Sequence, residues 1–218
     1  KILVIAPLTI AKDTWPKEVK KWEHLNDLTY SLILGSPDER RQAIIAKADI
    51  YIINRENVVW LVQELHKKNK KWPYDMVVID ELSSFKSSKS KRFRALKSVR
   101  PYIERFIGLT GTPAPNGLLD LWPQIFLLDN GKRLGRTITK YREEYFRPDR
   151  RVTQTVFHWE LREGAQEEIF EAISDLCISM KTEDYVTLPD KMMIRHELEF
   201  SEKQKAQYDE FKRQAVLE

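Results

Sequence analysis

The segment Met76-Val77-Val78-Ile79-Asp80-Glu81 places four apolar residues directly before two carboxylates. An unbroken apolar run of this length is typical of a strand that is covered on both faces, as in a parallel sheet. Ligands of open α/β sheets collect at the carboxyl ends of such strands. An acidic pair there can hold a hydrated Mg²⁺ and orient a water, as phosphoanhydride hydrolysis requires. A strand that simply turns into a loop, with Asp80 as a helix cap, explains the same residues.

Other apolar runs alternate with amphipathic segments along residues 1–129. Strands that alternate with helices of this length predict βαβ units and therefore a parallel sheet. Polar residues followed by proline or acids mark the helix starts, because they satisfy free N–H groups and complement the helix dipole. We expect four more strands at Ile2–Ala6, Tyr30–Leu34, Ile50–Ile53 and Arg105–Leu109, and helices that begin near Thr14, Ser36, Val58, Ser90 and Leu118.

The pattern changes after the helix predicted at 118–128. We divide the chain into residues 1–129, a mainly helical insertion at 130–189, and a return strand and helix at 190–218. In the later part we expect a hairpin strand at Gln154–Leu161, a helix at Glu167–Ile178, a strand at Met192–Phe200, and a final helix opened by a capping box from Ser201 to Gln204. Ile169, Phe170, Ile173 and Leu176 should face inward on the Glu167–Ile178 helix.

Composition limits the classes of protein that fit. The 218 residues are 42% hydrophobic and 32% charged, which suffices for one good core. The single cysteine, Cys177, excludes a disulfide within the chain and a cysteine-rich zinc site. No apolar run approaches the roughly 18 residues that a membrane span needs. We therefore expect a cytoplasmic protein without a membrane partner.

Positive charge is concentrated in two zones, although the net charge is only +4. Residues 86–100 contain seven Lys or Arg and no acid, and residues 132–151 contain eight Lys or Arg against three acids. Basic zones of this kind indicate a polyanionic partner. The alternative is that these side chains only solvate helix faces.

A second motif, Thr110-Gly111-Thr112-Pro113, follows one predicted strand and precedes a helix. Glycine and small hydroxyl residues let backbone N–H groups and hydroxyls bridge neighbouring loops near a phosphate. An ordinary turn between a strand and a helix uses the same residue types.

Together, the acidic pair and the threonine turn resemble the superfamily-two helicase core, and specifically the Swi/Snf-type DNA translocases. The resemblance covers almost the whole chain, and its motifs occur in the order of the family. It is carried by Ile5–Leu8 with Trp15, by Asp80–Ser83, by Phe85–Ser87 with Ser90–Leu96, by Leu109–Pro113, by Asn116, Leu118, Leu121 and Trp122, and by Leu188–Lys191 with Ser201, Gln204 and Tyr208. It implies an α/β fold of the three-layer, RecA-like P-loop NTPase type.

The resemblance also implies roles for individual residues. Asp80 would bind the Mg²⁺ of MgATP, and Glu81 would position or activate the attacking water. Thr110 and Thr112 would lie at the nucleotide and couple its site to DNA. Double-stranded DNA would be the partner, and contacts to its phosphates give salt-dependent affinity rather than sequence choice. The residues expected near the DNA backbone are Pro7, Leu8, Thr9, Lys86, Lys89, Lys91 and Arg92.

The chain departs from the family pattern at several positions. Ser83 stands where the family usually has histidine, and Ser179-Met180-Lys181 replaces a stretch that is usually rich in arginine. The 218 residues contain no G-x-x-x-x-G-K-[ST] loop, because their only Gly-Lys pair, Gly131-Lys132, is followed by Arg133. These departures indicate a divergent member from a bacterium or a phage.

We therefore expect a fragment of an ATP-dependent DNA translocase. Its Walker A loop would lie upstream of Lys1, and a second RecA-like lobe with an arginine finger would follow Glu218. Such a fragment should hydrolyse ATP poorly, hold neither ATP nor Mg²⁺ tightly, and self-associate weakly through exposed apolar surface. The alternative is a non-catalytic DNA-binding or docking module that retains the fold.

Overall fold

The computed structural model describes residues 1–148, 159–180, 192–195 and 199–215. The chain forms two compact units, Lys1–Cys177 and Ile178–Glu218, and each is described by itself. Most of the strand expected at Gln154–Leu161 and the whole of the Leu188–Lys191 motif lie outside the described residues. The same holds for the boundary expected between residues 189 and 190.

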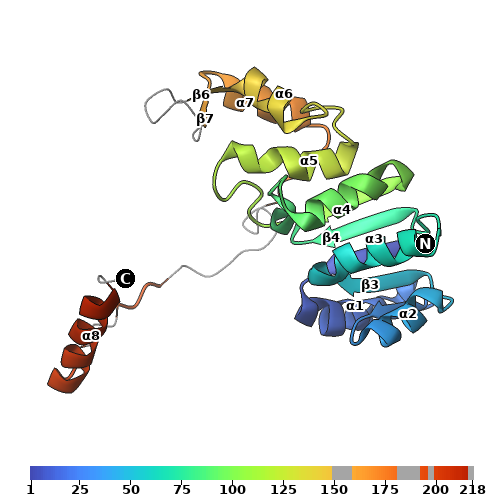
Figure 1. The fold of residues 1–218 in the computed structure, drawn as a ribbon, viewed down its shortest axis with the longest axis horizontal. Coiled ribbons are helices and arrows are strands. Elements are labelled where there is room, and N and C mark those ends of the chain that lie inside the picture. Colours follow the sequence, from blue (N-terminus) through green and yellow to red (C-terminus); the bar gives the residue numbers. More distant parts are fainter. Residues whose placement is uncertain (149–158, 181–191, 196–198, 216–218) are drawn as a thin grey trace. The chain divides into compact units, whose positions relative to one another are not determined.

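A five-stranded parallel sheet with the order β2-β3-β1-β4-β5 forms the centre of the first unit (Figure 1). All five predicted strands are confirmed, with shifts of at most one residue at an end. Ile5 pairs with both Ile53 and Ile79, so that β3, β1 and β4 end at the same level. The strands are β1 (Ile2–Ala6), β2 (Tyr30–Ile33), β3 (Ile50–Asn54), β4 (Met76–Asp80) and β5 (Arg105–Leu109).

The central strands are buried on both faces, which explains their continuous apolar runs. Every residue of β3 is buried, and only the two ends of β4 are partly exposed. Because side chains alternate across a strand, each strand supplies two separate cores. Leu3, Ile53 and Val77 belong to the larger core, whereas Val4 and Val78 belong to the smaller core.

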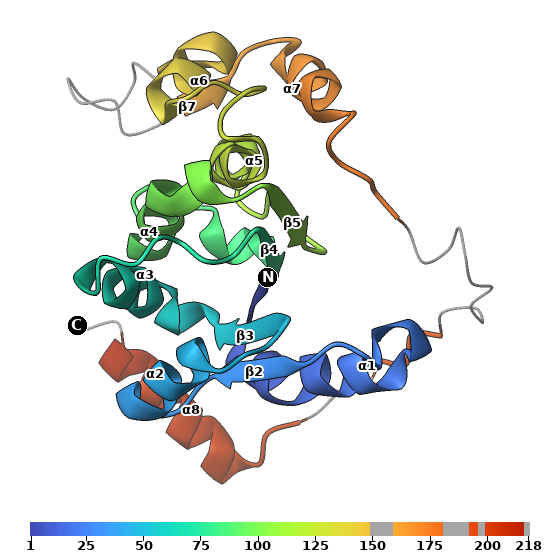
Figure 2. The same cartoon turned by 90° about the vertical axis from the view of Figure 1, so that its right-hand side faces the viewer.

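Helices cover both faces of the sheet and make three layers (Figure 2). α2, α3 and α4 pack on the face of the larger core, and α1 lies on the opposite face. The helices of the first unit are α1 (Trp15–Lys21), α2 (Pro37–Ile45), α3 (Val58–Lys67), α4 (Lys91–Val99), α5 (Leu121–Asp129), α6 (Ile138–Tyr145) and α7 (Ala165–Ile173). Short 3-10 turns occur at Glu23–Leu25, Arg55–Asn57, Leu82–Phe85, Arg100–Tyr102 and Leu118–Asp120.

Two of the predicted helix starts are confirmed by their hydrogen bonds. The Ser36 hydroxyl accepts a bond from the Glu39 N–H, and the Glu39 carboxylate accepts one from the Ser36 N–H. The Ser90 hydroxyl accepts a bond from the Phe93 N–H at 3.2 Å and so caps α4. These caps use only neighbouring residues, which is why the sequence alone predicts them.

The predicted cap at Thr14 is wrong. The chain is already helical from Leu8, and Thr14 has helical dihedral angles with no capping bond from its side chain. A π-helical turn at Ile10–Thr14 joins this start to α1. Pro16 has no N–H, and its ring would clash with the carbonyl of Lys12 in a regular α-helix. The wider turn before Pro16 relieves that clash.

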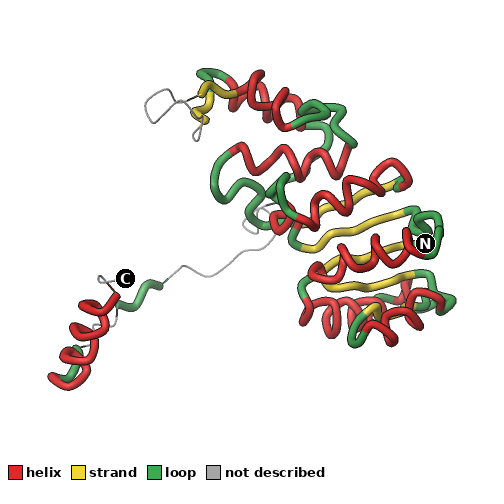
Figure 3. The backbone as a smooth tube through the Cα atoms, in the orientation of Figure 1, coloured by secondary structure: helices red, strands yellow, loops and turns green. Residues whose placement is uncertain are grey.

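Helices predominate after β5 in the first unit (Figure 3). β6 (Phe146–Pro148) pairs antiparallel with β7 (Trp159–Leu161), which confirms the described end of the predicted hairpin strand. α7 buries Ile169 and Ile173 as predicted but ends at Ile173. Phe170 is 48% exposed, so its predicted inward orientation is wrong. Residues next to one another in a helix point about 100° apart, and Ile169 already occupies the buried face.

The second unit contains α8 (Glu202–Ala215), which opens with the predicted reciprocal bonds between Ser201 and Gln204. The strand expected at Met192–Phe200 is not present in its described residues, 192–195 and 199–200. An alternating segment forms a stable strand only beside a neighbouring strand, and the described part of this unit offers none. Among the described helices of the chain, none is long and apolar enough to cross a membrane.

Candidate functional site

The parallel sheet brings the ends of four strands to one edge, which we call the carboxyl edge. Arg55 follows β3, Pro7 follows β1, Asp80 ends β4, and Thr110 follows β5. These strands are neighbours in the sheet, so residues that lie far apart in the sequence meet there. The structure thus gathers Pro7, Asp80, Glu81 and Thr110 at one edge, as the sequence predicts.

Glu81 is held in an unusual backbone conformation directly after β4. Its φ of 63° and ψ of 65° lie in the left-handed region, which few residues other than glycine adopt. Its Oε1 atom accepts a hydrogen bond from the Thr110 hydroxyl at 2.7 Å and a second, short bond from the Ser83 hydroxyl. Strained conformations of this kind persist where the surrounding structure fixes them, and they cluster at functional sites.

The same two bonds set the charge of Glu81. The hydroxyls of Ser83 and Thr110 stabilise the carboxylate and lower the pKa of Glu81 below its ordinary value of 4.5. Partial burial raises this pKa, but the hydrogen bonds outweigh burial, and the positive charge of Arg55 lowers the pKa further. Glu81 is therefore an ionised acceptor at neutral pH. It can orient a water molecule through its remaining oxygen.

Asp80 is fixed by a residue from a different element. Its Oδ2 atom accepts a hydrogen bond from the Trp15 indole N–H at 3.1 Å. Trp15 is the first residue of α1, immediately after the π-helical turn. We call Asp80, Glu81, Ser83 and Thr110, together with this indole, the acidic corner.

The acidic corner fits a hydrated Mg²⁺ better than a fully protein-bound metal. The described residues contain no cluster of three or more His, Cys, Asp or Glu that could enclose an ion. Mg²⁺ usually keeps several waters and takes one or two carboxylates together with phosphate oxygens. Asp80 and Glu81 each direct one oxygen to an internal donor, so their second oxygens are left for that purpose.

Thr110 and Thr112 have different positions in the site. Thr110 contacts Glu81 directly, whereas Thr112 reaches the site through its backbone N–H, which donates to the Thr110 hydroxyl at 3.3 Å. The side chain of Thr112 is exposed. The turn therefore connects the acidic corner to the surface through Thr110.

The residues predicted to lie near DNA fall into two groups beside this edge. Leu8 is 54% exposed and Thr9 is also exposed, directly after Pro7. Lys86 lies on the loop after β4, with its Nζ 3.7 Å from Asp120 Oδ2. Lys89 and Lys91 are exposed, and the Arg92 guanidinium lies over the Phe85 ring at 5.8 Å.

Two contributions to the site were missed by the sequence reasoning. Arg55 influences Glu81 electrostatically, and it could have been found as the residue that follows the predicted strand Ile50–Ile53. In the sequence, Ser83 stands out only as a departure from the histidine that is usual in the family. Its hydroxyl instead supplies one of the two bonds that hold Glu81.

A parallel sheet covered by helices on both faces, with paired carboxylates at its carboxyl edge, is the arrangement of a RecA-like lobe. All residues from 1 to 218 match the family model described as the SNF2-related domain. The chain belongs to this family, which confirms the resemblance to Swi/Snf-type proteins.

Several relatives match most of the chain. A protein of Acyrthosiphon pisum secondary endosymbiont phage 1, p41, is 35% identical over 99% of this chain and 48% of its own length. Helicase SWR1 of Kluyveromyces lactis is 28% identical over 77% of this chain and 11% of its own length. The human DNA annealing helicase and endonuclease ZRANB3 is 29% identical over 89% of this chain and 18% of its own length. The phage relative is consistent with the expected bacterial or phage origin.

A solved structure confirms the predicted fold class. The Sulfolobus solfataricus SWI2/SNF2 ATPase core in complex with dsDNA superposes with a TM-score of 0.57 at 24% identity. The similarity covers 79% of this chain and 32% of that chain. The chain spans about half of the phage relative and about a tenth of the yeast helicase, so it corresponds to one part of those proteins.

Proposed function

We propose that this chain is part of the ATPase motor of an ATP-dependent double-stranded DNA translocase. The observation that carries the proposal is the acidic corner, where Asp80 ends a buried strand, Glu81 follows it, and Thr110, just after the neighbouring strand β5, holds Glu81. Membership of the SNF2-related family and the fold of a SWI2/SNF2 ATPase core support it.

Asp80 and Glu81 have separate tasks in this proposal. Bound MgATP would supply the phosphoanhydride, with its metal neutralising charge on the phosphate oxygens. Asp80, held by Trp15, would take a position on the hydrated metal. Glu81, ionised and held by Ser83 and Thr110, would accept a hydrogen bond from the attacking water and orient it.

Thr110 supplies a physical route between hydrolysis and DNA. Its hydroxyl is bonded to Glu81, and its backbone continues into the exposed residues Gly111 and Thr112. If DNA binding shifted that turn, it would change the hydrogen bond that orients Glu81. We propose this link as the means by which Thr110 and Thr112 couple the two sites.

The nucleic-acid contacts belong to the same proposal. Pro7, Leu8 and Thr9, together with the basic loop of Lys86, Lys89, Lys91 and Arg92, would lie against the DNA backbone. Contacts of this type fix position on a duplex and do not read its sequence.

We also propose the division into a truncated lobe at 1–129, an insertion at 130–189, and a segment at 190–218 that leads to a second lobe. The 218 residues contain no phosphate-cradling G-x-x-x-x-G-K-[ST] loop. An arginine finger from the second lobe is worth about 10³–10⁵ in rate. The chain alone should therefore turn over ATP far more slowly than the longer protein.

Glu81→Gln in the longer protein tests the assignment. The amide cannot act as an ionised acceptor, so ATP turnover should fall by about 10²–10⁴-fold while ATP binding is retained. Glu104→Gln is the matched control, because Glu104 is exposed and precedes β5 at the opposite end of that strand. Normal turnover in the Glu81 variant would refute the proposed role.

A non-catalytic DNA-binding or docking module that retains the fold is the second candidate. The coding sequence on both sides decides between them. A Walker A loop upstream and an arginine motif downstream identify the motor, whereas stop codons at both ends identify the module.

A further inference from the structure

A groove of about 580 Å³ lies on the first unit between α4 and α6, with Trp122 of α5 also lining it. Four of its nine lining residues are cations, and none is an acid. Lys89, Arg94, Lys97 and Arg142 are these cations, and we call the site the basic groove. α4 and α6 both pack against α5, which brings the two basic zones of the sequence together.

The cations of the basic groove have no acidic partners in the described part of the chain, where no carboxylate lies within 4.0 Å of any of the four. Lys97 instead places its Nζ 4.7 Å from the centre of the Phe126 ring, and the Arg142 guanidinium lies 5.6 Å from the Trp159 ring. The Arg142 Nε is buried without a hydrogen-bond partner. Four like charges without counter-charges favour an anionic ligand.

The floor of the groove indicates which part of a ligand would be bound. Phe93 and Trp122 form this floor, and they are only 1% and 2% exposed. Buried rings cannot stack on nucleobases, whereas the stems of Lys and Arg can rest on such rings and present their charged ends to solvent. The groove is therefore suited to phosphates and not to bases.

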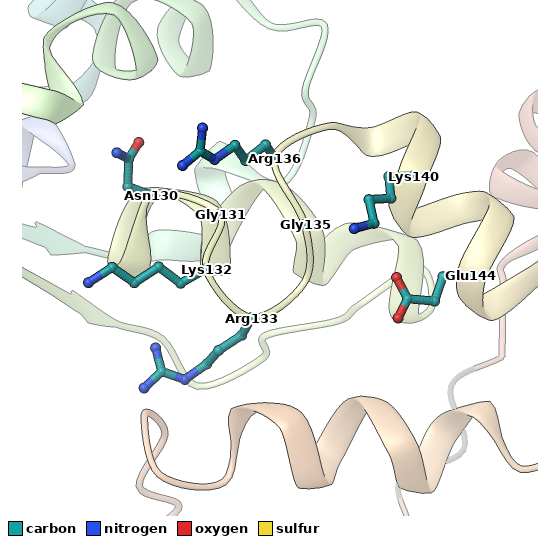
Figure 4. Close-up of a pocket in the computed structure, with 8 residues that line it drawn as sticks. All are labelled: Asn130, Gly131, Lys132, Arg133, Gly135, Arg136, Lys140 and Glu144. Carbon is teal, nitrogen blue, oxygen red and sulfur yellow. The ribbon is translucent and has the colours of Figure 1, made fainter.

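A second hollow, of about 540 Å³ around the loop after α5, shows that the number of cations is not the deciding property. It is lined by Lys132, Arg133, Arg136 and Lys140 but also by Glu144, which extends from α6 close to Lys140 (Figure 4). Arg133 is paired with Asp175 at 2.6 Å and with Asp129 at 3.4 Å. In this hollow, part of the positive charge is already compensated within the chain.

We propose that the basic groove is a second binding site for the phosphodiester backbone of double-stranded DNA, which adjoins the carboxyl edge at Lys89. The proposal rests on the proposed function for the identity of its partner. Lys89 precedes α4 by two residues and belongs to the basic loop that also carries Lys86. Positive charge therefore continues from the carboxyl edge along α4, so that one duplex or a second segment of it can contact both surfaces.

Three triple variants that each remove three positive charges test the proposal. The groove variant is Arg94→Gln/Lys97→Gln/Arg142→Gln, and the edge variant is Lys86→Gln/Lys91→Gln/Arg92→Gln. The loop control is Lys132→Gln/Arg133→Gln/Lys140→Gln, in which Arg133 is paired with Asp129 and Asp175 and Lys140 lies close to Glu144. The affinity for a short labelled duplex is measured by fluorescence anisotropy over a series of salt concentrations. Each lost phosphate contact lowers the slope of log K against log salt by about 1.

We expect the slope to fall by about 2–3 for the groove variant and by less than about 1 for the loop control. If the slope fell equally in these two variants, the effect would be one of net charge in general, and the proposed DNA site in the groove would be wrong. If the slope fell only in the edge variant, the proposed DNA site in the groove would be wrong, but DNA would remain the partner in the proposed function. No binding by the unmodified chain at low salt would overturn both proposals.

Folding of each variant is checked by circular dichroism and thermal unfolding. If the groove triple variant unfolds, Arg94→Gln alone keeps the test decisive, because Arg94 is exposed and makes only a backbone hydrogen bond to Lys89. This single variant should lower the slope by about 1. An unchanged slope would overturn the proposal.

Discussion

The acidic corner and the basic groove organise charge in opposite ways. In the acidic corner, Asp80 and Glu81 each accept hydrogen bonds from side chains of other elements, so their orientation is set before any ligand arrives. In the basic groove, Arg94 and Lys97 extend from one helix without an acidic partner among the described residues. The acidic corner is a preorganised site, and the groove is an uncompensated surface.

This difference predicts how each region responds to change. A preorganised site loses much of its stabilising interaction with a ligand when one supporting group is altered, because that interaction depends on the exact placement of its atoms. A charged surface attracts a polyanion through the number of its charges, and this attraction weakens as salt is added. Each single charge contributes little to the stability of the fold. Changes to the tight packing next to the acidic corner should therefore have the largest effects, and changes to single cations of the groove the smallest.

Gly108→Ala should have the largest effect on stability. A Cβ atom at Gly108 would lie 2.3 Å from Cδ2 and 3.1 Å from Cγ of Leu82, the residue that follows Glu81. Leu82 is 3% exposed, so it has little room to move. We expect the free energy of unfolding to fall by about 1–3 kcal/mol, measured by urea denaturation.

Gly111→Ala is the matched control for that experiment. A Cβ atom at Gly111 would meet nothing within 4 Å, and this glycine does not have a positive φ. Its effect should stay within about 0.5 kcal/mol. Equal losses in the two variants would contradict a close contact between Gly108 and Leu82.

Ser83→Ala and Thr110→Val should each raise the pKa of Glu81 towards its ordinary value of 4.5. The native pKa is lowered, so the ionised form stabilises the fold above the unfolded pKa. That contribution is lost as the pH falls through the folded pKa. Each variant should therefore lose about 1 kcal/mol at neutral pH and much less in acid.

NMR titration of the Glu81 carboxyl carbon measures this pKa, and unfolding at neutral and acidic pH measures the free energy. Thr112→Val is the control, because Thr112 reaches Thr110 through its backbone N–H. If all three variants gave the same Glu81 pKa, the two hydroxyls would not hold the carboxylate.

Arg94→Gln and Lys97→Gln in the basic groove should have the smallest effect. Both side chains are exposed, and neither has an ion-pair partner within the described ranges. The free energy of unfolding should change by less than about 0.5 kcal/mol, with slight stabilisation at low salt. A loss above about 1 kcal/mol in urea denaturation would mean that these cations support the fold.

The sequence predicts the sheet well because its information is local. β1 and β5 have the predicted bounds, since runs of β-branched and apolar residues end there at proline or at the threonine turn. The starts of α2 and α4 follow from caps within three residues of Ser36 and Ser90. Strand ends and helix starts of this kind can be predicted without knowing how the rest of the chain folds.

Long-range contacts explain what the sequence could not predict. The bond from Trp15 to Asp80 joins residues 65 positions apart. The bond from Thr110 to the Glu81 carboxylate joins residues 29 positions apart. Both basic zones are visible in the sequence, but pairing within them is not. Arg133 is neutralised by Asp175, which lies 42 positions further along the chain.

The π-helical turn at Ile10–Thr14 has a consequence for variation in chain length. It is closed by a bond from the Trp15 N–H to the Ile10 carbonyl, which spans one residue more than an α-helical bond. A homologue with one residue fewer at this turn can close the same helix with ordinary bonds and still deliver its indole to the aspartate. A deletion within α1 (Trp15–Lys21), which has no wide turn to absorb it, would rotate the residues on its two sides by about 100° relative to one another. Natural insertions and deletions should therefore be tolerated at this turn and excluded beside it.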